Sequence, residues 1–242
     1  MAFLQTGIFS QVLGIQTAFN VIIPEVKGQA KPKVLYLLHG LSDDHTIWSR
    51  RTSIERYASA YNLAVIMPTT QRGFYTNMKI GYNYWTYISE ELPEIVKSIF
   101  NISDKREDTF AAGLSMGGYG AIKLGLVCPD KFGAVASMSG ALNMRNRNDL
   151  SSLYEYESTF GVEFDDNNDL LFLADKLAKS GKERPRLYTC CGTEDFLYND
   201  NQIFLNKVKA LNYDIIYKEG PGNHTWEYWD TMIQDILKWM HS

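Results

Sequence analysis

Three residues, Ser115, Asp195 and His224, have the side chains and the chain order that nucleophilic catalysis by a serine hydroxyl requires. A serine hydroxyl is a weak nucleophile until a base takes its proton during the attack. Histidine is suited to this task near neutral pH, and a carboxylate can hold its ring in the required tautomer. The three residues therefore predict acyl transfer, with Ser115 as nucleophile, His224 as base and Asp195 as the orienting acid.

Ser115 lies in the pattern Gly113-Leu114-Ser115-Met116-Gly117, between a strand-like run at residues 109–112 and a helix-like run at residues 119–126. This context is that of a nucleophile elbow, in which a strained turn exposes the serine hydroxyl. The flanking glycines are expected because a Cβ at either position would collide with the neighbouring chain. The alternative is a glycine-rich turn that only joins a strand to a helix, so the later acid and base decide between the two.

Asp195 and His224 each follow a predicted strand, at residues 186–192 and 215–217 respectively. Ligand sites in open α/β sheets lie at the carboxyl ends of the strands, so we expect both side chains to meet Ser115 at one edge. Glu194 is a rival for the role of Asp195. His224 has the alternative reading of a solvated residue near a helix start.

An oxyanion hole needs two backbone N–H donors near the nucleophile. We expect the first from Met116, which follows the nucleophile, and the second from Leu41, with Gly40 as the alternative. Bulky side chains are also expected to narrow the acyl pocket: Trp48, Trp85, Met144 and Trp226. Trp226 has a second reading as an anchor of the last helix. The acyl pocket is therefore predicted to be small.

The rest of the chain alternates predicted strands and helices. Apolar runs predict further strands at residues 19–24, 34–38, 63–68 and 132–139. Helices are predicted at residues 49–60, 85–100, 203–211 and 226–240, and Pro93 is expected either to start a second segment or to kink the helix. Residues 141–180 are polar and are predicted to be a cap insertion of short helices. This order predicts a single α/β domain at residues 1–242, with a mostly parallel sheet flanked by helices.

The composition is that of a soluble globular protein, with 45% hydrophobic and 21% charged residues. The net charge of -4 and the lack of basic clusters argue against nucleic acid or a membrane surface as partner. The N-terminal segment has no basic region of the kind that opens a secretory signal, since the first Lys is Lys27. No run approaches the roughly 20 apolar residues of a membrane helix. The odd number of cysteines fits a reducing compartment. We therefore expect a cytoplasmic protein.

Neither a cofactor nor a metal is expected. Asp165, Asn167 and Asp169 imitate the start of a calcium loop, but Leu170 stands where the glycine belongs and Lys176 where the glutamate belongs. No nucleotide-binding glycine pattern occurs in the sequence. The expected partner is a small-molecule ester, and the sequence leaves the oligomeric state open, a homo-oligomer included.

Several motifs together resemble the esterase D-like branch of the α/β-hydrolases, which holds S-formylglutathione hydrolases, feruloyl-esterase-like proteins and bacterial tributyrin esterases. The matching stretches are His39-Gly40-Leu41-Ser42-Asp43-Asp44, residues 84–93, residues 113–121, Gly192-Thr193-Glu194-Asp195 and Gly222-Asn223-His224. The resemblance is closest to the tributyrin esterase family, cytosolic serine esterases of short-chain acyl esters. It implies an α/β-hydrolase fold with a small cap.

The leading hypothesis is a cofactor-independent serine carboxylesterase for acetyl to butyryl esters, tributyrin-like esters or acetylated carbohydrates. The alternatives are an S-formylglutathione-type thioesterase and an acyltransferase with the same triad. Leu114 stands where formylglutathione hydrolases usually carry histidine, which lowers the thioesterase reading. A catalytically silent carrier of acyl groups is disfavoured by the intact order of serine, aspartate and histidine.

Overall fold

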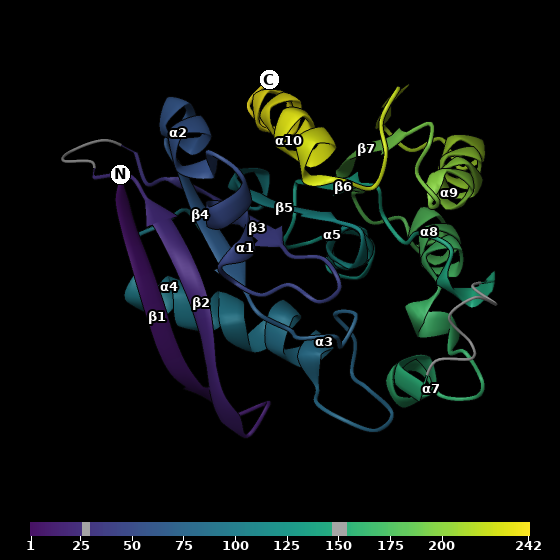
Figure 1. Ribbon diagram of the computed structural model, residues 1–242, viewed down its shortest axis with the longest axis horizontal. Coiled ribbons are helices and arrows are strands. Elements are labelled where there is room, and N and C mark those ends of the chain that lie inside the picture. Colours follow the sequence, from purple (N-terminus) through teal and green to yellow (C-terminus); the bar gives the residue numbers. More distant parts are fainter. Residues whose placement is uncertain (26–29, 147–153) are drawn as a thin grey trace.

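A computed structural model describes residues 1–25, 30–146 and 154–242, and within these ranges eight strands form one sheet (Figure 1). The strands are β1 (Ala2–Ser10), β2 (Ile15–Ile23), β3 (Lys33–Leu38), β4 (Leu63–Pro68), β5 (Thr109–Leu114), β6 (Ala134–Met138), β7 (Arg186–Gly192) and β8 (Ile215–Gly220). Their spatial order is β1-β2-β4-β3-β5-β6-β7-β8. Strands β3 to β8 pair in parallel, whereas β2 runs antiparallel to β1 and to β4. The predicted, mostly parallel sheet is confirmed.

Helices cover both faces of the sheet, and a separate hydrophobic cluster fills each interface. One face carries α1 (Ile47–Arg51), α2 (Ile54–Ala58) and the C-terminal α10 (Trp226–Met240). The other face carries α4 (Leu92–Ile99), α5 (Met116–Val127), α8 (Leu170–Lys179) and α9 (Tyr198–Ala210). Figure 1 shows α2 and α10 above β3 and β5 and α4 below them.

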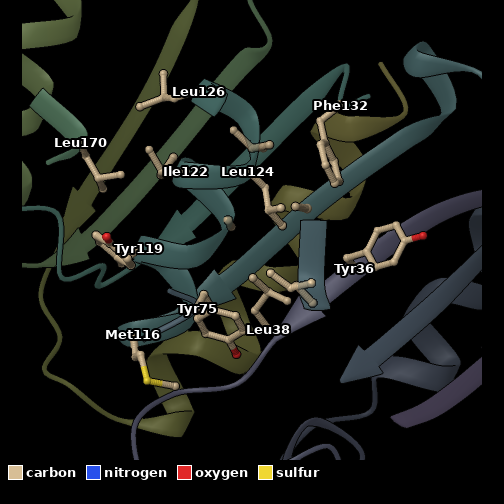
Figure 2. Close-up of a cluster of buried hydrophobic side chains, with 14 of the residues drawn as sticks. Tyr36, Leu38, Tyr75, Met116, Tyr119, Ile122, Leu124, Leu126, Phe132 and Leu170 are labelled. Atoms are coloured by element: carbon tan, nitrogen blue, oxygen red, sulfur yellow. The ribbon is translucent and has the colours of Figure 1, made fainter. Parts of the chain in front are cut away.

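Helix α5, which begins directly after Ser115, is the most deeply buried helix segment on its face. Its side chains pack with Tyr36 and Leu38 of β3, as Figure 2 shows. The Tyr119 hydroxyl donates to the Asn168 carbonyl at 2.8 Å, and the Tyr75 hydroxyl donates to the His39 carbonyl at 2.9 Å. Helix α5 and the loops around it are therefore fixed by both packing and hydrogen bonds.

Two predicted helices differ from the structure. Residues 49–60 form α1, α2 and the 3-10 turn η1 (Ser59–Tyr61), because Thr52 is extended and its hydroxyl donates to the Trp48 carbonyl at 2.6 Å. Residues 85–100 form α3 (Tyr84–Thr86), a π-type turn η2 (Tyr87–Glu91) and α4. Pro93 lies in the first turn of α4, where the missing N–H costs little, so the alternative in which it starts a second segment is confirmed.

The predicted insertion at residues 141–180 contains short helices: η4 (Met144–Asn146), α7 (Tyr154–Phe160), η5 (Asp166–Asn168) and α8. Residues 147–153 of the insertion lie outside the described residues. Asp165 and Asp169 act as helix caps, since their carboxylates accept the N–H groups of Asn167 and Leu171 at 2.8 and 2.9 Å. Within the described ranges, no group of His, Cys, Asp or Glu is arranged for a metal, and no helix is long and apolar enough to span a membrane.

Candidate active site

The backbone of Ser115 has φ 53° and ψ −117°, a strained combination for a residue with a side chain. Its N–H donates to the Met138 carbonyl at 2.9 Å, and its carbonyl accepts the Ala141 N–H at 3.2 Å. A Cβ on Gly113 would lie 2.4 Å from the backbone of Gly117, so the tight turn requires glycine there. The strained turn between β5 and α5 has the form expected of a nucleophile elbow.

The register of the parallel strands places the other predicted residues at the same edge as Ser115. Leu114 pairs with Met138, and Met138 pairs with Cys190 on β7. Strand β8 follows in register beside β7. A Cβ on Gly192 would lie 2.2 Å from the Gly222 carbonyl, which shows that the loops after β7 and β8 are in contact. These loops carry Asp195 and His224.

His224 and Asp195 form a hydrogen-bonded pair. The Nδ1 atom of His224 lies 2.9 Å from Oδ2 and 3.1 Å from Oδ1 of Asp195. The Asp195 side chain is fully buried, whereas 18% of the His224 side chain is exposed. With Nδ1 donating to the carboxylate, Nε2 of the neutral ring carries the lone pair that a general base needs. The pair therefore suits the roles predicted from the sequence.

The Asp195 carboxylate is stabilised in its charged form. Burial alone would raise its pKa, but hydrogen bonds from His224, from the Leu197 N–H at 2.8 Å and from the Ser139 hydroxyl outweigh burial and lower the pKa. Asp195 therefore remains ionised at neutral pH, as an orienting acid must.

Glu194, the rival carboxylate, has a different partner. Its Oε2 accepts the Gly222 N–H at 2.5 Å, and this hydrogen bond ties the loop after β7 to the loop after β8. The geometry favours Asp195 over Glu194 as the partner of His224.

Two residues that the sequence reasoning missed support this pair. Ser139 follows β6 at the same edge, is fully buried, and accepts the Trp229 indole N–H at 3.1 Å. The Trp229 ring packs edge-on against His224, with a centroid separation of 4.9 Å. Ser139 is the last residue of the strand predicted at residues 132–139, and this place at a carboxyl strand end was the available signal for its role.

Ser139→Ala is expected to lower kcat/KM about tenfold, because the variant loses one hydrogen bond to the Asp195 carboxylate and leaves the Trp229 N–H unpaired. Ser137→Ala is the matched control, since Ser137 is a buried serine on β6 whose hydroxyl lacks a partner among the described residues. Steady-state kinetics with a p-nitrophenyl ester measure kcat/KM of both variants, and thermal melts measure their stability. Equal activity losses in the two variants would contradict a positioning role for Ser139.

The predicted oxyanion donors belong to segments that lie against each other. A Cβ on Gly117 would lie 2.6 Å from the His39 carbonyl, so the start of α5 contacts the loop after β3. His39 fixes this loop, with Nδ1 donating to the Gly40 carbonyl at 2.7 Å and Nε2 accepting the Thr70 N–H at 3.0 Å. Burial lowers the pKa of His39 to about 4, which keeps the ring neutral. This arrangement is compatible with an oxyanion hole formed by Met116 and Leu41, which stays a prediction.

The four predicted pocket residues are not gathered together. Trp48 is buried and donates to the Leu38 carbonyl at 3.0 Å, and Trp226 packs edge-on between Trp48 and Trp229 with centroids 5.2 Å from each. Met144 is buried in the cluster on the α5 face. The Lys123 ammonium lies over the Trp85 ring, with Nζ 4.7 Å from the ring centroid. Trp85 also lines a cavity, and no triad residue is among the residues that line this cavity.

Phe196 is a further aromatic side chain beside His224. It is 67% exposed, and its ring centroid lies 4.5 Å from that of His224. Phe196 therefore lies where it can contact a molecule that approaches His224. Its place directly after Asp195 was the only signal in the sequence.

This chain is similar to known proteins along nearly its whole length. The Esterase family profile, described as "Putative esterase", matches residues 10–240. The chain belongs to this family. An acetyl esterase from Caldicellulosiruptor saccharolyticus is 31% identical over 261 aligned positions, which span 99% of this chain and 98% of that protein.

Two solved structures from Staphylococcus aureus are each 38% identical to this esterase. The fluorophosphonate-binding serine hydrolase FphF, with substrate bound, superposes with a TM-score of 0.93 over 100% of this chain and 98% of FphF. The S-formylglutathione hydrolase FrmB superposes with a TM-score of 0.91 over 100% of this chain and 99% of FrmB. The fold is therefore that of the α/β-hydrolases, and the protein is a serine esterase that hydrolyses carboxylic esters.

Proposed function

We propose that this esterase hydrolyses short-chain acyl esters, acetyl to butyryl, through an acyl-enzyme on Ser115. The observation that carries the proposal is the 2.9 Å contact of His224 Nδ1 with the Asp195 carboxylate, at the strand edge where the strained Ser115 turn lies. The acetyl esterase relative supports a small acyl group. The same triad also suits acetylated carbohydrates and tributyrin-like esters as substrates.

In the proposed mechanism, the Ser115 hydroxyl attacks the ester carbonyl while His224 Nε2 takes its proton. Asp195 stabilises the resulting imidazolium, and the backbone N–H groups of Met116 and Leu41 bind the oxyanion. The imidazolium then protonates the leaving alcohol. In the second half, His224 takes a proton from water, the hydroxide attacks the acyl-enzyme, and the acid is released as Ser115 regains its proton.

The chain-length preference is expected to favour acetate and butyrate over palmitate. The aromatic row of Trp48, Trp226 and Trp229 fills space next to His224, so a long acyl chain would have to displace packed rings. Hydrolysis of p-nitrophenyl esters from acetate to palmitate measures the preference. Faster turnover of the long esters would contradict the short-chain assignment.

The full-length similarity to FrmB favours S-formylglutathione as a second candidate substrate. A comparison of kcat/KM for S-formylglutathione and p-nitrophenyl acetate separates a thioesterase from a carboxylesterase. A clear preference for the thioester would replace the short-chain carboxylesterase assignment.

Added alcohols or sugars test the acyltransferase alternative, because a transferase would release acylated acceptor in place of the free acid.

A further inference from the structure

A cavity lies away from the triad, between α5, α8 and the loop that follows β4. Its volume is about 490 Å³, within the range of small-molecule sites. Lys123 on its wall follows Ser115 by eight residues along α5, which corresponds to about 12 Å at the helical rise. The cavity is therefore separate from the catalytic edge of the sheet.

The Lys123 ammonium is the only charged side chain buried in α5, and it has neutral hydrogen-bond partners. It is 3% exposed, and its Nζ donates to Thr76 Oγ1 at 3.0 Å and to Asn168 Oδ1 at 2.8 Å. The ammonium also lies over the Trp85 ring at 4.7 Å. No carboxylate forms an ion pair with Lys123 within the described ranges.

A buried ammonium without a counter-ion is costly. Burial lowers the pKa of Lys123 to about 7, although the negative charge of nearby Asp165 acts in the opposite direction. An ammonium has three N–H donors, and its hydrogen bonds to Thr76 and Asn168 use two of them. An anion in the cavity would supply both the missing acceptor and the missing negative charge.

The rest of the lining includes basic residues, apolar side chains and uncharged polar side chains. Lys79, Lys176 and Lys182 join Lys123, whereas Asp165 is the one acidic residue among the described lining residues. Lys182 is paired with Asp130 at 2.6 Å, whereas Lys79 and Lys176 are exposed and form no ion pair with another described residue. The apolar lining residues are Trp85, Leu126, Val127, Pro129, Leu173 and Leu177. The uncharged polar ones are Thr76, Asn77, Asn167, Asn168 and Ser180.

We propose that this cavity is a second binding site for a carboxylate with an apolar body, whose head group meets Lys123 and whose tail lies along Trp85 and the leucines of α8. The class includes medium-chain fatty acids and aryl carboxylates. The proposal stands apart from the esterase assignment, since neither its cavity nor its residues belong to the triad.

Octanoate is the probe, and 1-octanol is its neutral match. Octanoate is expected to bind saturably at one site by calorimetry and to change a tryptophan fluorescence signal that Trp85→Phe removes. Lys176→Glu should weaken octanoate binding about threefold and Lys123→Met about tenfold or more, because a buried charge-assisted hydrogen bond contributes more than an exposed charge. Octanol should bind at least about tenfold more weakly than octanoate.

Lys179→Glu is the matched control, because Lys179 is an exposed lysine of α8 that does not line the cavity and carries only a surface ion pair with Asp175. Its octanoate affinity should equal that of the wild type. Equal losses in the Lys176→Glu and Lys179→Glu variants, equal affinity for octanol, or no saturable binding would each overturn the proposal. Lys176→Glu alters an exposed side chain, so it tests octanoate binding in this cavity even if Lys123→Met fails to fold.

Discussion

Ser115→Ala is expected to lower kcat on the order of 10⁶-fold, or to the uncatalysed background, because the variant has no hydroxyl to form the acyl-enzyme. The change leaves the elbow intact, since the backbone of Ser115 is held by the Met138 carbonyl and the Ala141 N–H rather than by its side chain. Hydrolysis of p-nitrophenyl acetate by wild type and variant measures the loss.

The thermal midpoint of Ser115→Ala should match that of the wild type, because alanine keeps the Cβ and therefore the backbone strain at φ 53°. An inactive variant with an unchanged midpoint separates loss of chemistry from loss of structure. Activity within tenfold of the wild type would show that another residue is the nucleophile.

Asp195→Asn is expected to lower kcat about 10⁴-fold while the fold is kept. The amide replaces one acceptor oxygen of the carboxylate with an NH2 group, which is a donor and cannot accept the Nδ1 proton. The ring of His224 therefore loses its preferred tautomer. Without the negative charge, the imidazolium also loses its stabilisation. The Leu197 N–H and the Ser139 hydroxyl also bond the carboxylate, and an asparagine serves them less well.

Glu194→Gln is the matched control for Asp195→Asn, because it makes the same carboxylate-to-amide change one residue away. A glutamine oxygen can still accept the Gly222 N–H, so activity should stay within a few-fold of the wild type. A larger loss in Glu194→Gln than in Asp195→Asn would assign the orienting role to Glu194 instead.

The sheet and the order of the site residues could be predicted for two reasons. Buried parallel strands are continuous apolar runs in the sequence, and ligand sites in open α/β sheets lie at the carboxyl ends of the strands. The run at residues 34–38 and the glycine-flanked Ser115 follow these rules directly. The same rules place Asp195 and His224 after their strands, and the register of β5 to β8 brings these strand ends together.

Strand β1 was missed because both of its faces carry apolar side chains. Phe3 and Phe9 are 42% and 49% exposed, while Leu4 and Ile8 pack against the core, so the alternation of apolar and polar residues is weak. The helix predicted at residues 49–60 failed for a local reason. The backbone of Thr52 is extended, with φ −133° and ψ 169°, and α1 ends there.

The supporting residues of the site could not be predicted for a further reason. Ser139 and Trp229 are separated along the chain and meet only when β6 and α10 pack together. The spacing of residues shows which side chains share an edge or a helix face, but not which indole N–H reaches which hydroxyl. Trp85 illustrates the same limit, since the fold carries it to the Lys123 cavity rather than to the triad.

The central claim is that Ser115 is the nucleophile that His224 activates. Its most direct test is the mass of the protein after reaction with a fluorophosphonate, followed by peptide mapping of wild type, Ser115→Ala and His224→Ala. The account predicts one adduct on the peptide that contains Ser115, no adduct in Ser115→Ala, and strongly slowed labelling in His224→Ala. An adduct on another residue, or unchanged labelling of Ser115→Ala, would contradict it.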